Sequence, residues 1–217
     1  TNETIDTEDV SLSFARISIA DASIDYQNLS SDLHYRIDNL SLESQNTNVE
    51  GRPFNLDIAF RFLNNGLTQP VDIGVRSTIV ADISNENIFI SDINFALTPM
   101  LLTGEIAITS LDDALAYKGS FTSNDFDINM LMQTLGLSEP ETVFSGGVQK
   151  TQDLALGFQF NGNQEQLSFE NISGSLGATE IEAEANVRLV SGFIPDNISY
   201  DIIIDNIDLS PFLAFNE

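Results

Sequence analysis

Hydrophobic and polar residues alternate along most of this chain. Every second residue is large and apolar at five positions between residues 54 and 62, and at three positions between 156 and 160. These eight residues are Phe54, Leu56, Ile58, Phe60, Phe62, Leu156, Phe158 and Phe160. Such alternation places the apolar side chains on one face of a strand. Similar shorter runs, separated by polar turn-like clusters such as Ser84–Asn87, predict a mainly β fold, an antiparallel meander of roughly a dozen strands.

One departure from the alternation repeats along the chain. Two polar residues interrupt it in Ile37-Asp38-Asn39-Leu40 and in Ile204-Asp205-Asn206-Ile207, with looser copies at residues 90–95 and 169–172. A strand that continues through such a pair must take up an extra residue as a β-bulge to keep its apolar face on one side. A tight turn between two short strands would use the same residues. The sequence leaves both interpretations open.

One segment has the period of a helix instead of a strand. Apolar residues at positions 128, 131, 132 and 135 follow the i, i+3, i+4, i+7 spacing. Asp125 or Asp127 can cap the start and Gly136 can end it, which predicts one short amphipathic helix near residues 126–136. Residues 137–147 contain Pro140 and two glycines and form a candidate loop boundary. Strands of the same character on both sides favour a single β domain over residues 1–217.

The chain is strongly acidic, with 33 Asp and Glu against 8 Lys and Arg in 217 residues and a formal net charge of −25. Nucleic acid is therefore not an expected partner, because its binding depends on basic residues that neutralise phosphates. Hydrophobic residues still make up 42% of the chain, including fifteen Phe. This content is too high for a disordered acidic tail and predicts a folded domain.

Residues that carry catalysis or metal binding are scarce. The absence of cysteine excludes disulfides, thiolate catalysis and cysteine-containing zinc sites. The one histidine, His34, lies in a strand-like segment without a nucleophile motif. Asp125–Asn129 begins like a calcium-binding loop, but Met130 stands where that loop needs glycine. Acidic residues could form a glycosidase pair, yet no motif brings two together. We therefore expect no catalytic residues, no metal and no cofactor.

The predicted sheet has more apolar surface than one short helix can cover. A sheet of about a dozen strands is expected to curl, to split into two packed layers, or to close. If the sheet curls and its concave side stays open, the apolar face forms a groove for acyl chains. If side chains fill that side, the same face is the core of a sandwich or barrel. The eight apolar residues at positions 54–62 and 156–160 are thus candidates either for lining a lipid-binding groove or for forming a core.

Seven segments of the chain carry a family resemblance. They are Ala22–Tyr26, Tyr35–Leu42, Val49–Phe60, Gly119–Phe126, Leu131–Gly136, Pro140–Thr142 and Tyr200–Leu213. In this order, and with the helix in this place, they resemble the C-terminal region of the AsmA family of periplasmic proteins over nearly the whole chain. The ending departs from the family pattern, because Phe212 stands where the family often has Tyr and Ser210-Pro211 replaces the usual Asp-Arg.

The resemblance implies an elongated, curled β-sheet with an open hydrophobic groove, an architecture called a β-taco in relatives. It also implies that this sequence is part of a longer protein in the periplasm of a Gram-negative bacterium, with an N-terminal anchor in the inner membrane. The implied role is non-enzymatic support of outer-membrane homeostasis, with phospholipid acyl chains as the bound partner. The residues leave open the alternative of a β-sandwich adhesion or glycan-binding module with a filled core.

Overall fold

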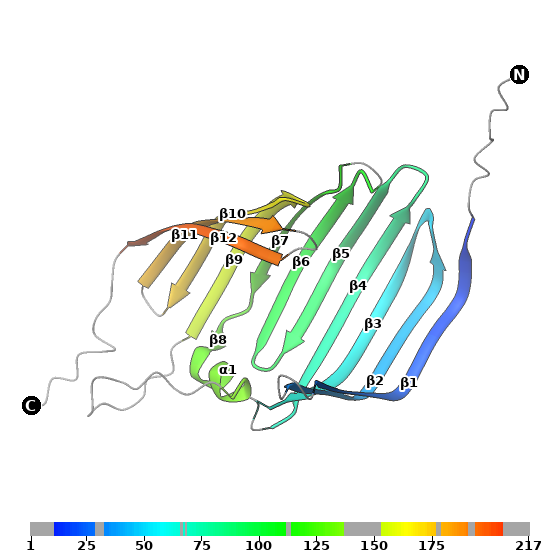
Figure 1. Ribbon diagram of the computed structural model, residues 1–217, viewed down its shortest axis with the longest axis horizontal. Coiled ribbons are helices and arrows are strands. Elements are labelled where there is room, and N and C mark those ends of the chain that lie inside the picture. Colours follow the sequence, from blue (N-terminus) through cyan, green and yellow to red (C-terminus); the bar gives the residue numbers. More distant parts are fainter. Residues whose placement is uncertain are drawn as a thin grey trace, which may run out of the picture.

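The computed structural model describes residues 11–28, 33–65, 67, 69–111, 114–136, 153–176, 179–190 and 194–205. Within this part of the chain, one sheet of twelve antiparallel strands is accompanied by one short helix (Figure 1). Each strand pairs with the next along the chain, with one exception. The strand at Ala116–Ser123 (β7) pairs with Asp153–Asn163 (β9), and the two-residue strand Phe126–Asp127 (β8) between them in the chain also pairs with β9. The predicted antiparallel meander is therefore confirmed.

The strands differ in length along the sheet, and the longest ones come first in the chain. Their bounds are Ser13–Asn28 (β1), Leu33–Asn48 (β2), Glu50–Asn64 (β3), Val71–Asp82 (β4), Asn87–Leu97 (β5), Met100–Thr109 (β6), Ala116–Ser123 (β7), Phe126–Asp127 (β8), Asp153–Asn163 (β9), Gln166–Leu176 (β10), Thr179–Val190 (β11) and Ile194–Asp205 (β12).

The two faces of the sheet differ in exposure in the way that the alternation predicts. In β3, Phe54, Leu56 and Ile58 are half-buried, whereas Asn55 and Asp57 between them are exposed. Successive side chains of a strand point to opposite faces. The apolar residues of β3 therefore share one face, the apolar face, and the polar residues share the other.

The described strands form one layer, and no second layer covers the apolar face. Only Val71, Ala81, Ile93, Phe126 and Leu189 are buried apolar residues in the described part, and no large side chain there is fully buried. The sheet is open because β1 and β12 form its two edges without pairing with each other. Figure 1 shows that the sheet does not stay flat, since β12 lies across the view of β7 and β9. The curled, open form predicted from the sequence is confirmed.

The repeated polar pairs form bulges within continuous strands. Asn39, Asp92 and Asn171 have φ angles of 54°, 50° and 50°, and the strand continues on both sides of each. The pairing register shifts beside each of them. The bulge takes up one extra residue, so the apolar side chains after it return to the same face of the sheet. Leu40 therefore lies on the same face as Ile37. The fourth copy reaches Asn206, which lies outside the described residues.

The helix α1 (Ile128–Thr134) follows β8 directly. The Asp127 carboxylate caps it by accepting hydrogen bonds from the backbone N–H groups of Asn129 at 2.8 Å and Met130 at 3.2 Å. The predicted helix is confirmed, with Asp127 as its cap. Among the described residues, no helix has the length and apolar character needed to cross a membrane. The candidate loop boundary at 137–147 lies outside the described residues.

Candidate functional site

The eight apolar residues predicted for the site lie on β3 and β9, and all are half-buried on the apolar face. Four strands, β4 to β7, separate β3 from β9 in the sheet. Neighbouring strands lie about 4.8 Å apart, so the two groups are roughly 24 Å apart along the sheet. The structure therefore places the eight residues on one face without bringing them into one cluster.

Apolar residues of the intervening strands connect the two groups into rows that cross the sheet. One row, followed through directly paired residues from β3 to β12, is Phe54, Ile79, Ile90, Ile106, Gly119, Phe160, Phe169, Ala185 and Tyr200. With eight strand spacings, this row is roughly 38 Å long. The hydrocarbon core of a bilayer is about 30 Å thick and holds two acyl chains end to end. The row is thus longer than one acyl chain.

Four phenylalanines form an aromatic cluster where β7, β9 and β10 meet. The ring centroids of Phe121 and Phe158 are 5.6 Å apart, and those of Phe158 and Phe169 are 5.9 Å apart. Phe160 lies 6.1 Å from Phe121. The alternation in the sequence predicted Phe158 and Phe160 for the site, but Phe121 and Phe169 were not predicted. Both missed residues alternate with polar neighbours, so the signal was present in the sequence.

A second group of aromatic rings lies on the same face near the other edge of the sheet. Tyr35 stacks between Tyr26 and Phe62, with centroid distances of 6.3 Å and 6.1 Å. Of these three residues, only Phe62 was predicted for the site from the sequence. The apolar face thus carries aromatic surface towards both ends, with mainly aliphatic residues on β4, β5 and β6 between them.

Three glycines lie beneath aromatic rings of the apolar face. A Cβ added at Gly119 would lie 2.7 Å from the Phe160 ring and 2.4 Å from the carbonyl oxygen of Glu105. A Cβ at Gly104 would lie 2.5 Å from the Phe121 ring, and one at Gly162 would lie 2.8 Å from the Tyr117 ring. The rings therefore lie directly against the backbone of the neighbouring strand, where no side chain fits.

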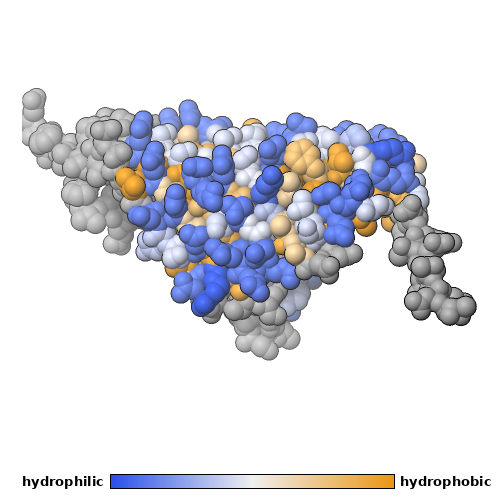
Figure 2. All heavy atoms as spheres, turned by 90° about the horizontal axis from the view of Figure 1, so that it is seen from above, coloured by the Kyte–Doolittle hydropathy of each residue, from blue (hydrophilic) through white to orange (hydrophobic). Residues whose placement is uncertain are grey.

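Charged side chains occupy the opposite face of the sheet. Arg61 pairs with Asp72 and Arg76 pairs with Asp57, each at 2.9 Å. The hydrogen bond and negative charge of Asp72 raise the pKa of Arg61. In strands β4 to β11, apart from their bulges, no Asp, Glu, Lys or Arg occupies a position on the apolar face. Figure 2 shows apolar side chains exposed between hydrophilic ones on the side seen from above.

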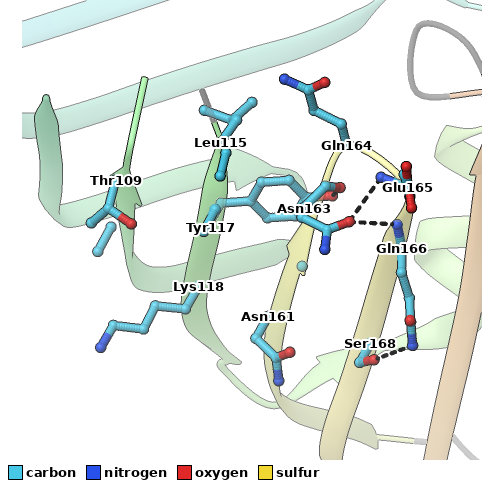
Figure 3. Close-up of a pocket in the computed structure, with 14 residues that line it drawn as sticks. Thr109, Leu115, Tyr117, Lys118, Asn161, Asn163, Gln164, Glu165, Gln166 and Ser168 are labelled. Atoms are coloured by element: carbon cyan, nitrogen blue, oxygen red, sulfur yellow. Dashed lines mark hydrogen bonds between the residues drawn. The ribbon is translucent and has the colours of Figure 1, made fainter. Parts of the chain in front are cut away.

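A polar pocket of about 780 Å³ lies at the end of the β9–β10 hairpin and contains none of the eight predicted residues (Figure 3). The Asn163 Oδ1 accepts hydrogen bonds from the backbone N–H groups of Glu165 at 2.8 Å and Gln166 at 3.0 Å. The Tyr117 hydroxyl donates to the Asn163 carbonyl oxygen at 2.8 Å. Burial raises the pKa of Tyr117. These bonds hold the hairpin in shape, so we assign the pocket a structural role.

The other residues with chemical potential are dispersed. The His34 Nε2 lies 3.0 Å from the Asp25 Oδ1, and both side chains are well exposed, at 41% and 61%. In the described part of the chain, no group of three or more His, Cys, Asp or Glu side chains is arranged to hold a metal ion. The apolar face is therefore the candidate site that the geometry favours.

Comparison of the chain with models of protein families, with curated proteins and with solved structures found no match.

Proposed function

We propose that this protein is a non-enzymatic, AsmA-like module of the periplasm that binds phospholipid acyl chains along its apolar face. In this proposal the intact protein is anchored in the inner membrane and supports outer-membrane homeostasis by conducting phospholipid between the two membranes. One observation carries the proposal. A single-layered sheet presents an apolar face that runs across the strands, and no second layer covers it in the described residues.

The energetics of such a face suit an acyl chain. Removing one CH₂ group from water contributes about 0.8 kcal/mol, and this gain requires no fixed polar contact. The half-buried residues of β3 and β9 provide such surface, and the rows between them are continuous. A bound chain can therefore move along the face without breaking specific bonds. This property supports conduction as well as binding.

The alternative of a β-sandwich adhesion or glycan-binding module receives less support. A sandwich packs two sheets face to face, with interdigitating side chains about 10 Å apart. The described strands all belong to one sheet. The amide-rich pocket at the β9–β10 hairpin does not favour a glycan either, because the Asn163 side chain is occupied by the backbone of the turn.

A pair of substitutions in β9 tests the proposal. Phe158→Asp places a charge on the apolar face, whereas Gln159→Asp places the same group at the adjacent exposed position on the opposite face. Each variant is purified from a Gram-negative host, checked by circular dichroism and extracted with solvent for lipid mass spectrometry. We expect Phe158→Asp to lose most co-purifying phospholipid and Gln159→Asp to retain the wild-type amount.

A photocrosslinking experiment covers the case in which Phe158→Asp fails to fold. The aromatic photoreactive residue p-benzoylphenylalanine at position 158 preserves an aromatic side chain there. Irradiation should attach phospholipid at position 158 but not at position 159. If neither position forms a lipid adduct and the wild-type protein carries no phospholipid above a size-matched periplasmic β-protein, the proposal is wrong.

A further inference from the structure

Two bulges mark one row of the apolar face as a crease in the sheet. This crease row runs from β4 to β10 through residues that are paired or lie opposite a bulge, and consists of Ser77, Ile93, Gly104, Phe121, Phe158 and Ile172. The bulges at Asp92 in β5 and Asn171 in β10 both fall in it, and bulges bend the strands that carry them. Ile93 is 7% exposed and is the only buried apolar residue of the described strands β5, β6 and β7. Because no second layer covers it, its burial comes from neighbouring strands of a sheet that bends there.

The crease row begins at a hydroxyl group that has no partner. Ser77 lies on the same face as Val75 and Ile79 and is only 8% exposed. Among the described residues its hydroxyl makes no hydrogen bond, and no side-chain oxygen or nitrogen there is both sealed from solvent and unpartnered. The Ser77 Oγ can therefore still be reached from the apolar face. Nearly all buried polar groups have a hydrogen-bond partner, so a hydroxyl without one requires an explanation.

The other serines on this face between β2 and β7 are already bonded within the protein. The Ser44 Oγ lies 2.7 Å from the Thr47 Oγ1, and the Ser123 Oγ accepts a hydrogen bond from the backbone N–H of Leu156 at 2.8 Å. Ser44 is the closest counterpart of Ser77, because both pair directly with Leu56 from its two sides. Ser77 thus differs from its neighbours on the face in having a hydroxyl that only a ligand or water can engage.

We infer that Ser77 donates a hydrogen bond to an ester carbonyl oxygen of a bound phospholipid, whose acyl chain lies along the crease row with its methyl end at the aromatic cluster. Beyond Ser77 the row offers only apolar side chains and one glycine. Phe121 and Phe158 lie three and four strand spacings from Ser77, roughly 14 and 19 Å. Half of a bilayer's hydrocarbon core is about 15 Å thick, so one acyl chain reaches from the hydroxyl to these rings.

This inference rests on the proposed function, because it takes phospholipid as the ligand, and it adds a polar contact and an orientation. The apolar face alone treats both ends of a chain alike. A hydroxyl can donate to the carbonyl oxygen of an ester, and only the carboxyl end of an acyl chain carries that acceptor. One neutral hydrogen bond contributes little net free energy, so it gives the chain a preferred position without preventing movement along the face.

Ester and ether phospholipids test the contact, because an ether lipid has the same chains without the carbonyl oxygen. Delipidated protein is incubated with vesicles that contain equal amounts of diester and diether phosphatidylethanolamine, and the bound lipids are quantified by mass spectrometry. The wild-type protein should retain the diester about 2- to 10-fold over the diether, the range expected for one neutral hydrogen bond. Ser77→Ala should bind the two equally. Ser44→Ala, the matched control in the same row, should keep the wild-type preference.

The outcomes separate this inference from the proposed function. If the wild-type protein binds both lipids equally, or if Ser77→Ala keeps the preference for the diester, the inference is overturned and acyl-chain binding stands. If the wild-type protein binds neither lipid, both are overturned. Circular dichroism checks that each variant is folded, and the comparison of the two lipids on the wild-type chain needs no variant at all.

Photoreactive phospholipids test the orientation on the unmodified chain. A diazirine next to the ester carbonyl should attach to peptides from β4 or β5, which lie beside Ser77. A diazirine at the methyl end of the same chain should attach to peptides from β7 or β9, which carry Phe121 and Phe158. Adducts in the opposite order, or the same distribution from both lipids, would overturn the inferred orientation.

Discussion

At the scale of single residues, the apolar face depends on glycines that leave room for aromatic rings. Gly119→Ala should destabilise the protein by about 1–3 kcal/mol, because the added methyl group overlaps both the Phe160 ring and the Glu105 carbonyl oxygen. Gly74→Ala is the matched control, since its nearest atom, the Cβ of Ala96, is 3.8 Å away. This control should be neutral or stabilising by up to about 1 kcal/mol. Urea unfolding measures both, and equal effects would contradict the explanation.

The same glycines show how far single residues of the site could be predicted from the sequence. Alternation was sufficient to place Phe158 and Phe160 on one face, because period two is a local property of the strand. It was not sufficient to place the Phe160 ring over Gly119. That contact depends on the pairing of β7 with β9, two strands separated in the chain by β8, α1 and residues 137–152. Only the register of distant strands determines such a contact.

At the scale of the strand, the bulges require residues that accept a positive φ. Asn39 has a φ of 54° and an exposed side chain, so its substitution changes backbone strain with little change in burial. Asn39→Val should cost about 1–2 kcal/mol, because a β-branched residue is strongly disfavoured in the left-handed region. Asn39→Gly should change stability by less than about 0.5 kcal/mol, since Gly adopts this conformation readily.

A control for this prediction lies on the same strand. Gln45 is exposed and is not among the residues with positive φ, so Gln45→Val should be close to neutral. The free energy of unfolding in urea distinguishes the three variants. If Asn39→Val is as stable as Asn39→Gly, the bulge is not held by the backbone conformation of Asn39.

The bulges also show why element boundaries were harder to predict than element types. The pair Asp38-Asn39 has the same local preference for a left-handed residue in a tight turn and in a bulge. The neighbouring strand decides between the two, because β3 continues through Phe60 opposite both Asn39 and Leu40 of β2, which leaves one extra residue on β2. The helix was different. Its spacing and its cap are both local, and the sequence predicted the helix with Asp125 or Asp127 as its cap, of which the structure has Asp127.

At the scale of the whole molecule, positive charge is concentrated in the first four strands. Arg16, Arg36, Arg52, Arg61 and Arg76 each pair with a carboxylate there. The polar face of β11 and β12 is instead acidic, and Glu184 lies directly opposite Asp201. Like charges in directly paired positions destabilise a sheet. The net charge of −25 therefore acts most strongly against pairing at the C-terminal edge.

Reversing one of these charges should stabilise the sheet most at low ionic strength. Glu184→Lys converts the contact with Asp201 into an opposite-charge pair, whereas Glu182→Lys makes the same change of net charge opposite the apolar Ile203. At about 0.01 M salt the Debye length is about 30 Å, and we expect Glu184→Lys to raise the thermal unfolding midpoint by about 2–4 °C more than Glu182→Lys does. At about 1 M salt, where that length falls to about 3 Å, the difference should shrink. An equal gain from both variants at low salt would mean that overall net charge, and not the direct pairing of β11 with β12, limits the stability of this edge.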